Sequence, residues 1–340
     1  MTSPLITERE SQVLLALINR YIQQGHPIGS KALLDSEDLG ISPATIRNTL
    51  VRLEDKGMVY QPHTSAGRVP TDKGYRLYVE LGLKEGFSGN AEELGQRWMV
   101  EAKLQQGNVD AILGQLASIV GDVSCQLGIV MAPVFEQGIF HTLELVRLSD
   151  NRLMLVLTID QGFVKSLVIK VDVRVSQREL ESVSQLLNQR LHGLTMEEIR
   201  ASGRERLRSV ESSAPLLLKV VVEEIEGLSE PDSTDLYIAG SRNLCLQPEF
   251  SDPLRMAGLM DMVEKKEPLA HLLSGRQGMV ITIGDEHECQ EMHLCSMVTA
   301  SYDVNGIGGV IGVIGPTRMP YGRVVALVNY AATRVGTLVI

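Results

Sequence analysis

The chain has 340 residues, which is too long for one ordinary hydrophobic core, so we expect two or three domains. Its composition, 44% apolar and 22% charged, is that of an average soluble protein, and no stretch approaches the roughly 20 apolar residues of a membrane span. The net charge of −10 argues against a nucleic-acid-binding protein, but residues 1–80 sum to zero, so the rest of the chain carries all of it.

Neither the N-terminus nor the cysteine content indicates secretion. The opening MTSPLITERESQ has no basic segment followed by an apolar run. The four cysteines are too few for a disulfide framework, which is typical of a protein in a reducing compartment. We therefore expect a cytoplasmic protein.

The chain begins with two predicted helices. The first spans residues 7–24, where Thr7 and Glu10 have the spacing of a capping box. A glycine- and proline-rich break at 25–29 separates it from a short helix that begins at Ser30. With the helix that follows, this is the order of a helix-turn-helix preceded by a leading helix.

The next helix is predicted from Pro43 to Lys56. Ser42 is a favourable N-cap, Pro43 suits the first helical position, and Gly57 suits a left-handed residue after the end. At about 100° per residue the helix has an apolar stripe and an opposite face. The stripe is Ile46, Leu50 and Leu53; the opposite face holds Ala44, Asn48 and Arg52, with Thr45 and Arg47 on the flanks.

A small hairpin is predicted next, with strands at 58–61 and 68–70 and the short polar tip HTSA between them. Thr71 caps a helix that runs to about residue 83. Together these elements indicate a winged helix-turn-helix. The Gly- and Ser-rich residues 84–92 are the predicted linker.

The remainder alternates between helical and strand patterns. We predict a helical region at 93–121, strands at 125–133, 141–148, 152–160 and 164–172, mostly helices from 176 to 227, a small hairpin at 236–246, one helix at 253–273, strands at 279–284, 294–302 and 308–316, and a helix at 323–334. Strands, then about 100 mostly helical residues, then strands again favour an α+β domain with an insertion.

Five stretches are specific enough to compare with a known family. They are PIGSKAL (27–33), SPATIRN (42–48), LEDKGMVYQPHTSAGRVPTDKGYRLYV (53–79), CSMVTASY (295–302) and GVIGVIGPTRMPY (309–321). They closely resemble the HrcA family of bacterial heat-inducible transcription repressors, and the resemblance extends from about residue 5 to 335.

This resemblance implies a fold and a function. The implied fold is α+β: an N-terminal winged helix-turn-helix (1–84), a linker (85–92), and a GAF-like α+β domain (93–174 and 276–340) that carries a mostly helical inserted dimerisation domain (175–275). The implied function is repression of chaperone operons by a homodimer that binds double-stranded DNA at an inverted repeat, the CIRCE operator. The GroE chaperonin is the implied partner that keeps the repressor active.

The candidate DNA-binding residues lie on the predicted reading helix, the wing and the preceding helix. They are Ser30, Lys31, Ser42, Ala44, Thr45, Arg47, Asn48, Arg52, His63, Thr64, Ser65 and Arg68. Asn pairs well with adenine and Arg with guanine, so Arg47 and Asn48 are the candidates for base contact. The alternative is that Arg47 touches only phosphate.

The other candidates are assigned to the DNA backbone or the minor groove, and some have an alternative role that involves no DNA contact. Arg52 and Lys56 are phosphate contacts or solvated charges. Arg68 and the wing tip suit the backbone or minor groove, unless Ser and Thr there only stabilise the turn. Ser30 and Lys31 would position the protein on phosphates. Residues 41–80 hold six cations against four acids, a small excess that favours two copies on one operator.

Other functions have little support in the sequence. His287, Cys289, His293 and Cys295 form two H-x-C pairs, but the spacing usual for zinc is absent, so we expect no metal and no cofactor. The glycine-rich run 306–316 lacks the G-x-G-x-x-G spacing, and no catalytic triad signature is found. We therefore expect a repressor that is not an enzyme. Two alternatives are a repressor whose GAF-like domain senses a small effector, and an enzyme with an accessory winged helix.

Overall fold

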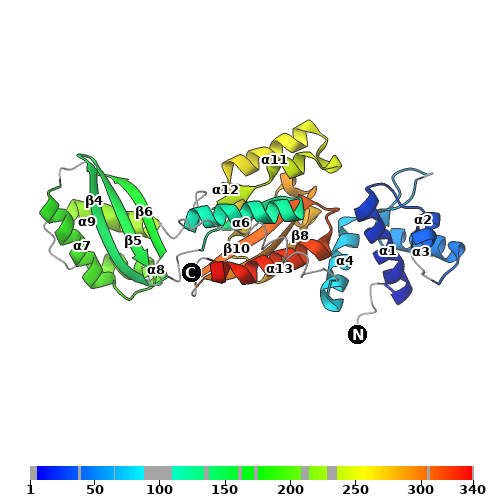
Figure 1. The fold of residues 1–340 in the computed structure, drawn as a ribbon, viewed down its shortest axis with the longest axis horizontal. Helices are drawn as coiled ribbons and strands as arrows, with labels where there is room; N and C mark the ends of the chain where they lie inside the picture. Colours follow the sequence, from blue (N-terminus) through cyan, green and yellow to red (C-terminus); the bar gives the residue numbers. More distant parts are fainter. Residues whose placement is uncertain are drawn as a thin grey trace.

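The structure is a computed structural model that describes residues 6–36, 40–64, 66–87, 109–133, 138–159, 163–171, 175–207, 214–227, 236–304 and 307–338. Figure 1 shows three parts in a row: a winged-helix domain (6–87), a central domain (109–133 and 236–338) and an insertion (138–227) at the far end. Among the described residues, no helix has both the length and the apolar character needed to cross a membrane.

The winged-helix domain follows its local sequence signals. Its elements are α1 (Glu8–Gln24), α2 (Ser30–Ser36), α3 (Pro43–Asp55), β1 (Val59–Tyr60), β2 (Val69–Pro70) and α4 (Asp72–Glu85). The predicted capping box is present, since the Thr7 N–H donates to Glu10 Oε2 (2.7 Å) and the Glu10 N–H donates to Thr7 Oγ1 (3.3 Å). Thr71 caps α4 by accepting the Gly74 N–H at 3.1 Å. These predicted helix starts are confirmed.

The apolar stripe of α3 forms part of the domain core. Ile46, Leu50 and Leu53 are buried, as are Val13 and Leu17 on the neighbouring α1. Lys56 forms the C-cap of α3, and Gly57 follows with a left-handed φ of 69°. The predicted amphipathic helix is confirmed, and its opposite face is left for solvent or a ligand.

The central domain is a five-stranded antiparallel sheet between two helical layers. Its strands, in the order β7-β3-β10-β9-β8, are β3 (Leu127–Met131), β7 (Leu236–Ala239), β8 (Met279–Ile283), β9 (Cys295–Val304) and β10 (Ile307–Pro316). Its helices are α6 (Val109–Ser124), α10 (Ser241–Cys245), α11 (Pro253–Lys265), α12 (Glu267–Leu273) and α13 (Tyr321–Leu338), with short 3₁₀ turns η3 (Pro248–Phe250), η4 (Gly284–Glu286) and η5 (Gln290–Met292). α6 and α13 cover one face, and α11 and α12 cover the other (Figure 1).

The glycine-rich run is the central strand β10, as its buried β-branched residues predicted. A Cβ at Gly312 would collide with the backbone oxygen of Val298 on β9. Glycine is therefore required there by strand packing.

The insertion has its own sheet and its own helices. β4 (Phe140–Ser149), β5 (Arg152–Ile159) and β6 (Phe163–Lys170) pair in that order, and α7 (Gln177–Leu191), α8 (Met196–Leu207) and α9 (Pro215–Gly227) accompany them. At the edge of the sheet, the Asn188 amide bonds both the N–H (2.7 Å) and the C=O (3.1 Å) of Leu143 on β4. The insertion leaves the central domain after β3 and returns at β7, which is the strand paired with β3.

Three predictions differ from this arrangement. The insertion predicted at 175–275 would separate α7 from the sheet on which it packs, and would include β7, α11 and α12, which belong to the central domain. The predicted hairpin at 236–246 is one strand followed by α10, because Gly240 turns the chain with a φ of 83°. The helix predicted at 253–273 is two helices, divided at Lys266, whose φ is 60°.

Some predicted segments lie outside the described residues. These are 88–92 of the predicted linker, the helical stretch 93–108, and Ser65 at the tip of the wing. The described end of the linker, Phe87, packs on Tyr78 with their rings 5.9 Å apart.

Candidate DNA-binding interface

The outer face of α3 is free of protein contacts that would bury it. Ala44, Arg47, Asn48 and Arg52 are exposed, and Thr45 is half-buried beside them. Helical periodicity placed Ala44, Asn48 and Arg52 opposite the apolar stripe, and Thr45 and Arg47 on its flanks. The helix thus presents a small apolar side chain, an amide and two guanidinium groups to the outside.

Ser42 has a structural task at the start of this helix. Its Oγ accepts the Thr45 N–H at 3.2 Å and lies 2.9 Å from Thr45 Oγ1. This is an N-cap bond, and it fixes the first turn of α3. Ser42 is exposed, so a phosphate oxygen can still approach its hydroxyl.

The preceding helix α2 adds one exposed cation. Ser30 is its first residue and is half-buried, whereas Lys31 is exposed. Because α2 has only seven residues, its dipole is small, and an attraction for phosphate there rests on the Lys31 charge.

The wing is a two-stranded hairpin with a braced tip. His63 and Thr64 are exposed at the tip. The Gln61 side-chain amide donates to the Thr64 C=O (3.0 Å) and to the Ala66 C=O (2.9 Å). Sequence reasoning did not assign this role to Gln61, although a glutamine flanking a tight turn is a signal that could have suggested it.

Arg68 is engaged inside the domain. Its guanidinium pairs with Glu54 on α3 at 2.8 Å, and its backbone N–H and C=O pair with Ile28 at 2.8 and 2.9 Å. With a side chain only 15% exposed, Arg68 connects the wing to α3 and to the segment before α2. Its position favours a role in shaping the wing over a contact with DNA.

Lys56 is also used within the domain. Its Nζ bonds Glu10 Oε2 at 2.8 Å, and that carboxylate is buried. The bond from Lys56, with those from Thr7, lowers the pKa of Glu10. Among the predicted phosphate contacts of α3, Arg52 remains exposed.

The two H-x-C pairs do not converge. Cys295 is buried in β9, whereas Nδ1 of His293 lies 3.3 Å from Asp285 Oδ1. His287 is buried, and within the described residues neither of its ring nitrogens has a hydrogen-bond partner. In the part of the chain that the structure describes, no group of three or more His, Cys, Asp or Glu side chains could hold a metal ion.

Comparison with known proteins agrees with this geometry. Family models match residues 5–82, as the winged helix-turn-helix transcription repressor, HrcA DNA-binding, and residues 110–325, as the HrcA protein C terminal domain. Proteins described as heat-inducible transcription repressor HrcA are 39% identical in Prosthecochloris aestuarii, over 98% of this chain and 97% of that protein, and 36% identical in Geobacter sulfurreducens, over 98% of each.

A solved structure described as a hypothetical protein at 2.2 Å resolution has the same fold, with a TM-score of 0.64 and 23% identity over 98% of each chain. The two family models together span the winged-helix and C-terminal regions, and the relatives align along nearly their whole length. The chain therefore belongs to the HrcA family of heat-inducible transcription repressors.

Proposed function

We propose that this repressor binds as a homodimer to an inverted-repeat operator of the CIRCE type and thereby represses chaperone operons. The observation that carries the proposal is the exposed face of α3 that holds Arg47 and Asn48. As a member of a transcription-repressor family the protein acts by binding and is not an enzyme. The operator type and the chaperone operons come from the family resemblance.

Each candidate residue has a role suited to its chemistry. Arg47 and Asn48 read base edges in the major groove, and Ala44 and Thr45 meet a thymine methyl or a nearby phosphate. Lys31, Arg52, Ser30 and Ser42 hold the backbone, while His63, Thr64 and Ser65 bring the wing to it. Arg68 supports the wing through Glu54.

Two copies are needed because one winged-helix domain has little excess positive charge. Residues 41–80 hold six cations against four acids, and Lys56 and Arg68 are already paired with carboxylates. Phosphate contacts dominate affinity, so a single domain binds weakly. A two-fold dimer doubles these contacts and matches an inverted repeat.

The outer face of the insertion sheet is our candidate for the dimer interface. Val146, Val164 and Val168 are exposed on β4 and β6, and strand register places Val146, Met154 and Val168 in one row. The opposite face, with Leu143, Leu145, Leu155 and Leu157, is buried. An exposed apolar sheet face is typical of an association surface, and a second copy provides a matching face.

The partner implied by the family is the GroE chaperonin. A physical feature supports this dependence: β5 and β6 carry the apolar runs LMLVLTI and SLVIKV, which are prone to aggregation when unfolded. We infer that chaperonin supply sets the amount of active repressor.

A gel-shift experiment tests the proposed function. The full chain is titrated onto an inverted-repeat operator, onto a single half-site and onto random DNA, with and without chaperonin, at two temperatures. We expect preference for the inverted repeat and a higher active fraction with chaperonin, most clearly at the higher temperature. Equal binding to all three DNAs would refute the operator proposal, and quantitative refolding with full binding in the absence of chaperonin would refute the dependence.

A second candidate function is the sensing of a small effector. A cavity of about 720 Å³ lies where α4 meets the central domain, and Asp72, Arg255, Asp285 and His293 line it. A ligand there would touch both domains. A rise in melting temperature with one member of a metabolite panel, and none with chaperonin, would favour this alternative.

A further inference from the structure

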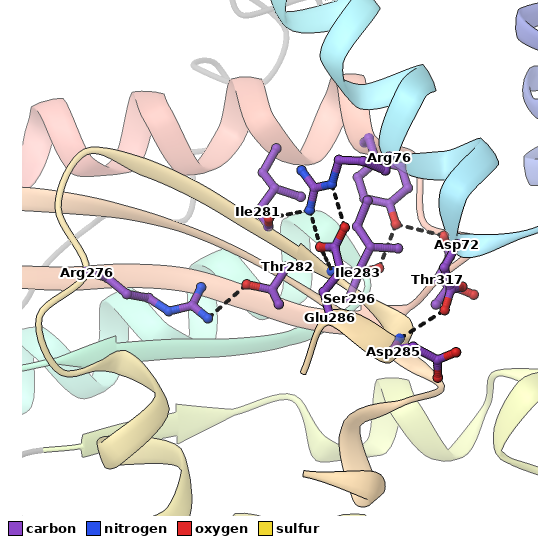
Figure 2. A network of polar contacts seen from close by, with 11 residues as sticks. Asp72, Arg76, Arg276, Ile281, Thr282, Ile283, Asp285, Glu286, Ser296 and Thr317 are labelled. Carbon is purple, nitrogen blue, oxygen red and sulfur yellow. Dashed lines mark hydrogen bonds and ion pairs between the residues drawn. The ribbon is translucent and has the colours of Figure 1, made fainter. Parts of the chain in front are cut away.

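The winged-helix domain is held on the central domain by polar contacts from one face of α4. Figure 2 shows Arg76 bridging to η4 and β8: its Nε donates to Glu286 Oε1 (2.6 Å), its Nη2 donates to the Ile281 C=O (2.7 Å), and Nη2 also pairs with Glu286 Oε2. One turn earlier, Asp72 Oδ2 accepts the backbone N–H of Asp285 at 2.9 Å. We call these two bridges, Arg76 with Glu286 and Asp72 with Asp285, the α4 clamp.

The receiving side of the α4 clamp is shaped for close approach. Gly284 has a φ of 51°, and a Cβ at this position would collide with the Asp72 carboxylate. The strand that leads into it is held by Arg276, whose guanidinium donates to Thr282 Oγ1 at 2.9 Å (Figure 2). The same guanidinium also donates to Thr299 Oγ1 at 3.2 Å. The α4 clamp therefore joins α4 to a part of the central domain that is itself held by side-chain hydrogen bonds from Arg276 to β8 and β9.

Within the α4 clamp, the charges of Arg76 and Glu286 support each other. Hydrogen bonding to Glu286 raises the pKa of Arg76. Burial alone would raise the pKa of Glu286, but its bonds to Arg76 and to the Ile283 N–H lower it. Both groups are thus charged at neutral pH, and the bidentate geometry fixes their relative orientation.

A second attachment lies at the C-terminal end of α1. Arg318, between β10 and α13, donates to the Ile22 C=O at 2.9 Å and pairs with Glu249. Aromatic packing lies between the two attachments, with the ring of Tyr321 5.9 Å from that of Tyr75. Contacts at α4 and at α1 together restrict rotation of the winged-helix domain about either one.

This docking leaves the candidate DNA surface uncovered. Ala44, Arg47 and Asn48 on α3 and His63 and Thr64 on the wing are exposed while α4 is docked. In Figure 1, α4 faces the central domain, whereas α2 and α3 lie on the far side of the winged-helix domain. The docked arrangement presents α3 outward, so it does not block DNA.

We propose that the α4 clamp sets the operator spacing that this repressor accepts, with Arg76 as a positioning residue that touches no DNA. The inference rests on the proposed dimeric operator binding. In a dimer, the distance and angle between the two α3 helices depend on how firmly each winged-helix domain is held. Two linked binding modules gain affinity only when their geometry matches the spacing of the two half-sites.

The test measures the dissociation constants of the full-length protein for three kinds of DNA. These are the inverted repeat, a single half-site, and inverted repeats whose spacer is longer or shorter by a few base pairs. Arg76→Ala should weaken binding to the inverted repeat by roughly tenfold and flatten the preference for one spacer. Half-site binding should stay within about twofold of wild type, and the salt dependence there should be unchanged because no phosphate contact is lost. The matched control is Arg9→Ala, which removes an exposed arginine of α1.

A charge-reversal experiment distinguishes the loss of the Arg76–Glu286 ion pair from a general folding defect. The double variant Arg76→Glu with Glu286→Arg should recover much of the spacer preference, whereas each single reversal should not. The proposal would be overturned if Arg76→Ala lost the same affinity for the half-site as for the inverted repeat, or if it kept the wild-type spacer preference. If the wild-type protein itself shows no preference for the inverted repeat over the half-site, the dimeric operator proposal fails instead.

Discussion

Arg47 is the residue whose chemistry most directly suits base recognition, because it is exposed on the outer face of α3 next to Asn48. Arg47→Ala should weaken operator binding by about 1–3 kcal/mol and blur discrimination at one base pair. The measurement is the dissociation constant on the operator, on operators with single base-pair changes, and on random DNA. An equal loss on random DNA would show that Arg47 contacts only phosphate.

His287 makes the stability of the protein sensitive to acid. Burial lowers its pKa from 6.5 to about 4, and the charge of Arg276 contributes, against the opposing effect of Glu286. The folded state therefore favours the neutral ring, while the unfolded chain takes up a proton first as the pH falls below about 6.5. The contribution of the neutral ring to stability is fully present above about pH 6.5 and is lost as the pH falls towards 4. At pH 5 the free energy of unfolding is about 2 kcal/mol lower than above pH 6.5.

The check on His287 is the melting temperature of wild type and His287→Gln at pH 7.5 and pH 5. The wild-type protein should lose more stability between the two pH values than the variant. A parallel loss in both proteins would assign the acid sensitivity to other groups.

At the scale of elements, an ion pair between Lys56 and Glu10 adds to the apolar packing between α1 and the end of α3. Glu10 is buried and accepts from Lys56 Nζ at 2.8 Å, and this bond lowers the pKa of Glu10 below 4.5. Its stabilising effect is therefore present above about pH 4.5 and is lost as the pH falls through the lowered value.

Lys56→Met should destabilise the protein by roughly 1–3 kcal/mol, because it leaves a buried carboxylate without its cation. Glu10→Gln should lower the free energy of unfolding by less, since it removes the buried negative charge itself. Urea unfolding at pH 7 measures both, with the exposed Lys84→Met as the control. A cost for Lys56→Met no larger than that of the control would mean that the pair adds no stability.

At the scale of the whole molecule, the exposed valines of the insertion should determine the oligomeric state. Val164 and Val168 are 59% and 57% exposed, so a lysine at either position fits the single chain but repels a second copy. Val164→Lys with Val168→Lys should shift the protein to monomer and should remove the preference for an inverted repeat while half-site binding persists.

Analytical ultracentrifugation measures this shift directly. Leu254→Lys on α11 is the matched control, because Leu254 is an exposed apolar residue outside the insertion. A dimer that persists in the double variant would place the interface elsewhere on the molecule.

Much of the winged-helix domain follows from sequence because its signals are local. The capping bonds at Thr7, Ser42 and Thr71 join residues three positions apart, and the apolar stripe of α3 is set by helical periodicity. These interactions form wherever the chain places the helix. The exposed candidates Arg47 and Asn48 follow from the same periodicity.

Other features depend on how distant segments meet. The runs that became β4–β6 and those of the central sheet have the same apolar character, so sequence alone placed the insertion boundary wrongly. The roles of Arg68 and Lys56 were likewise missed, since their partners Glu54 and Glu10 are set by packing within the domain.

By itself, then, the sequence determined helix α3, its caps, the wing and the family to which the chain belongs. Only the tertiary structure decided which strands share a sheet and how the winged-helix domain is held. The physical reason is distance along the chain: Arg76 and Glu286 are 210 residues apart, and no local preference encodes their meeting. Such a contact exists only where the two domains are packed against each other.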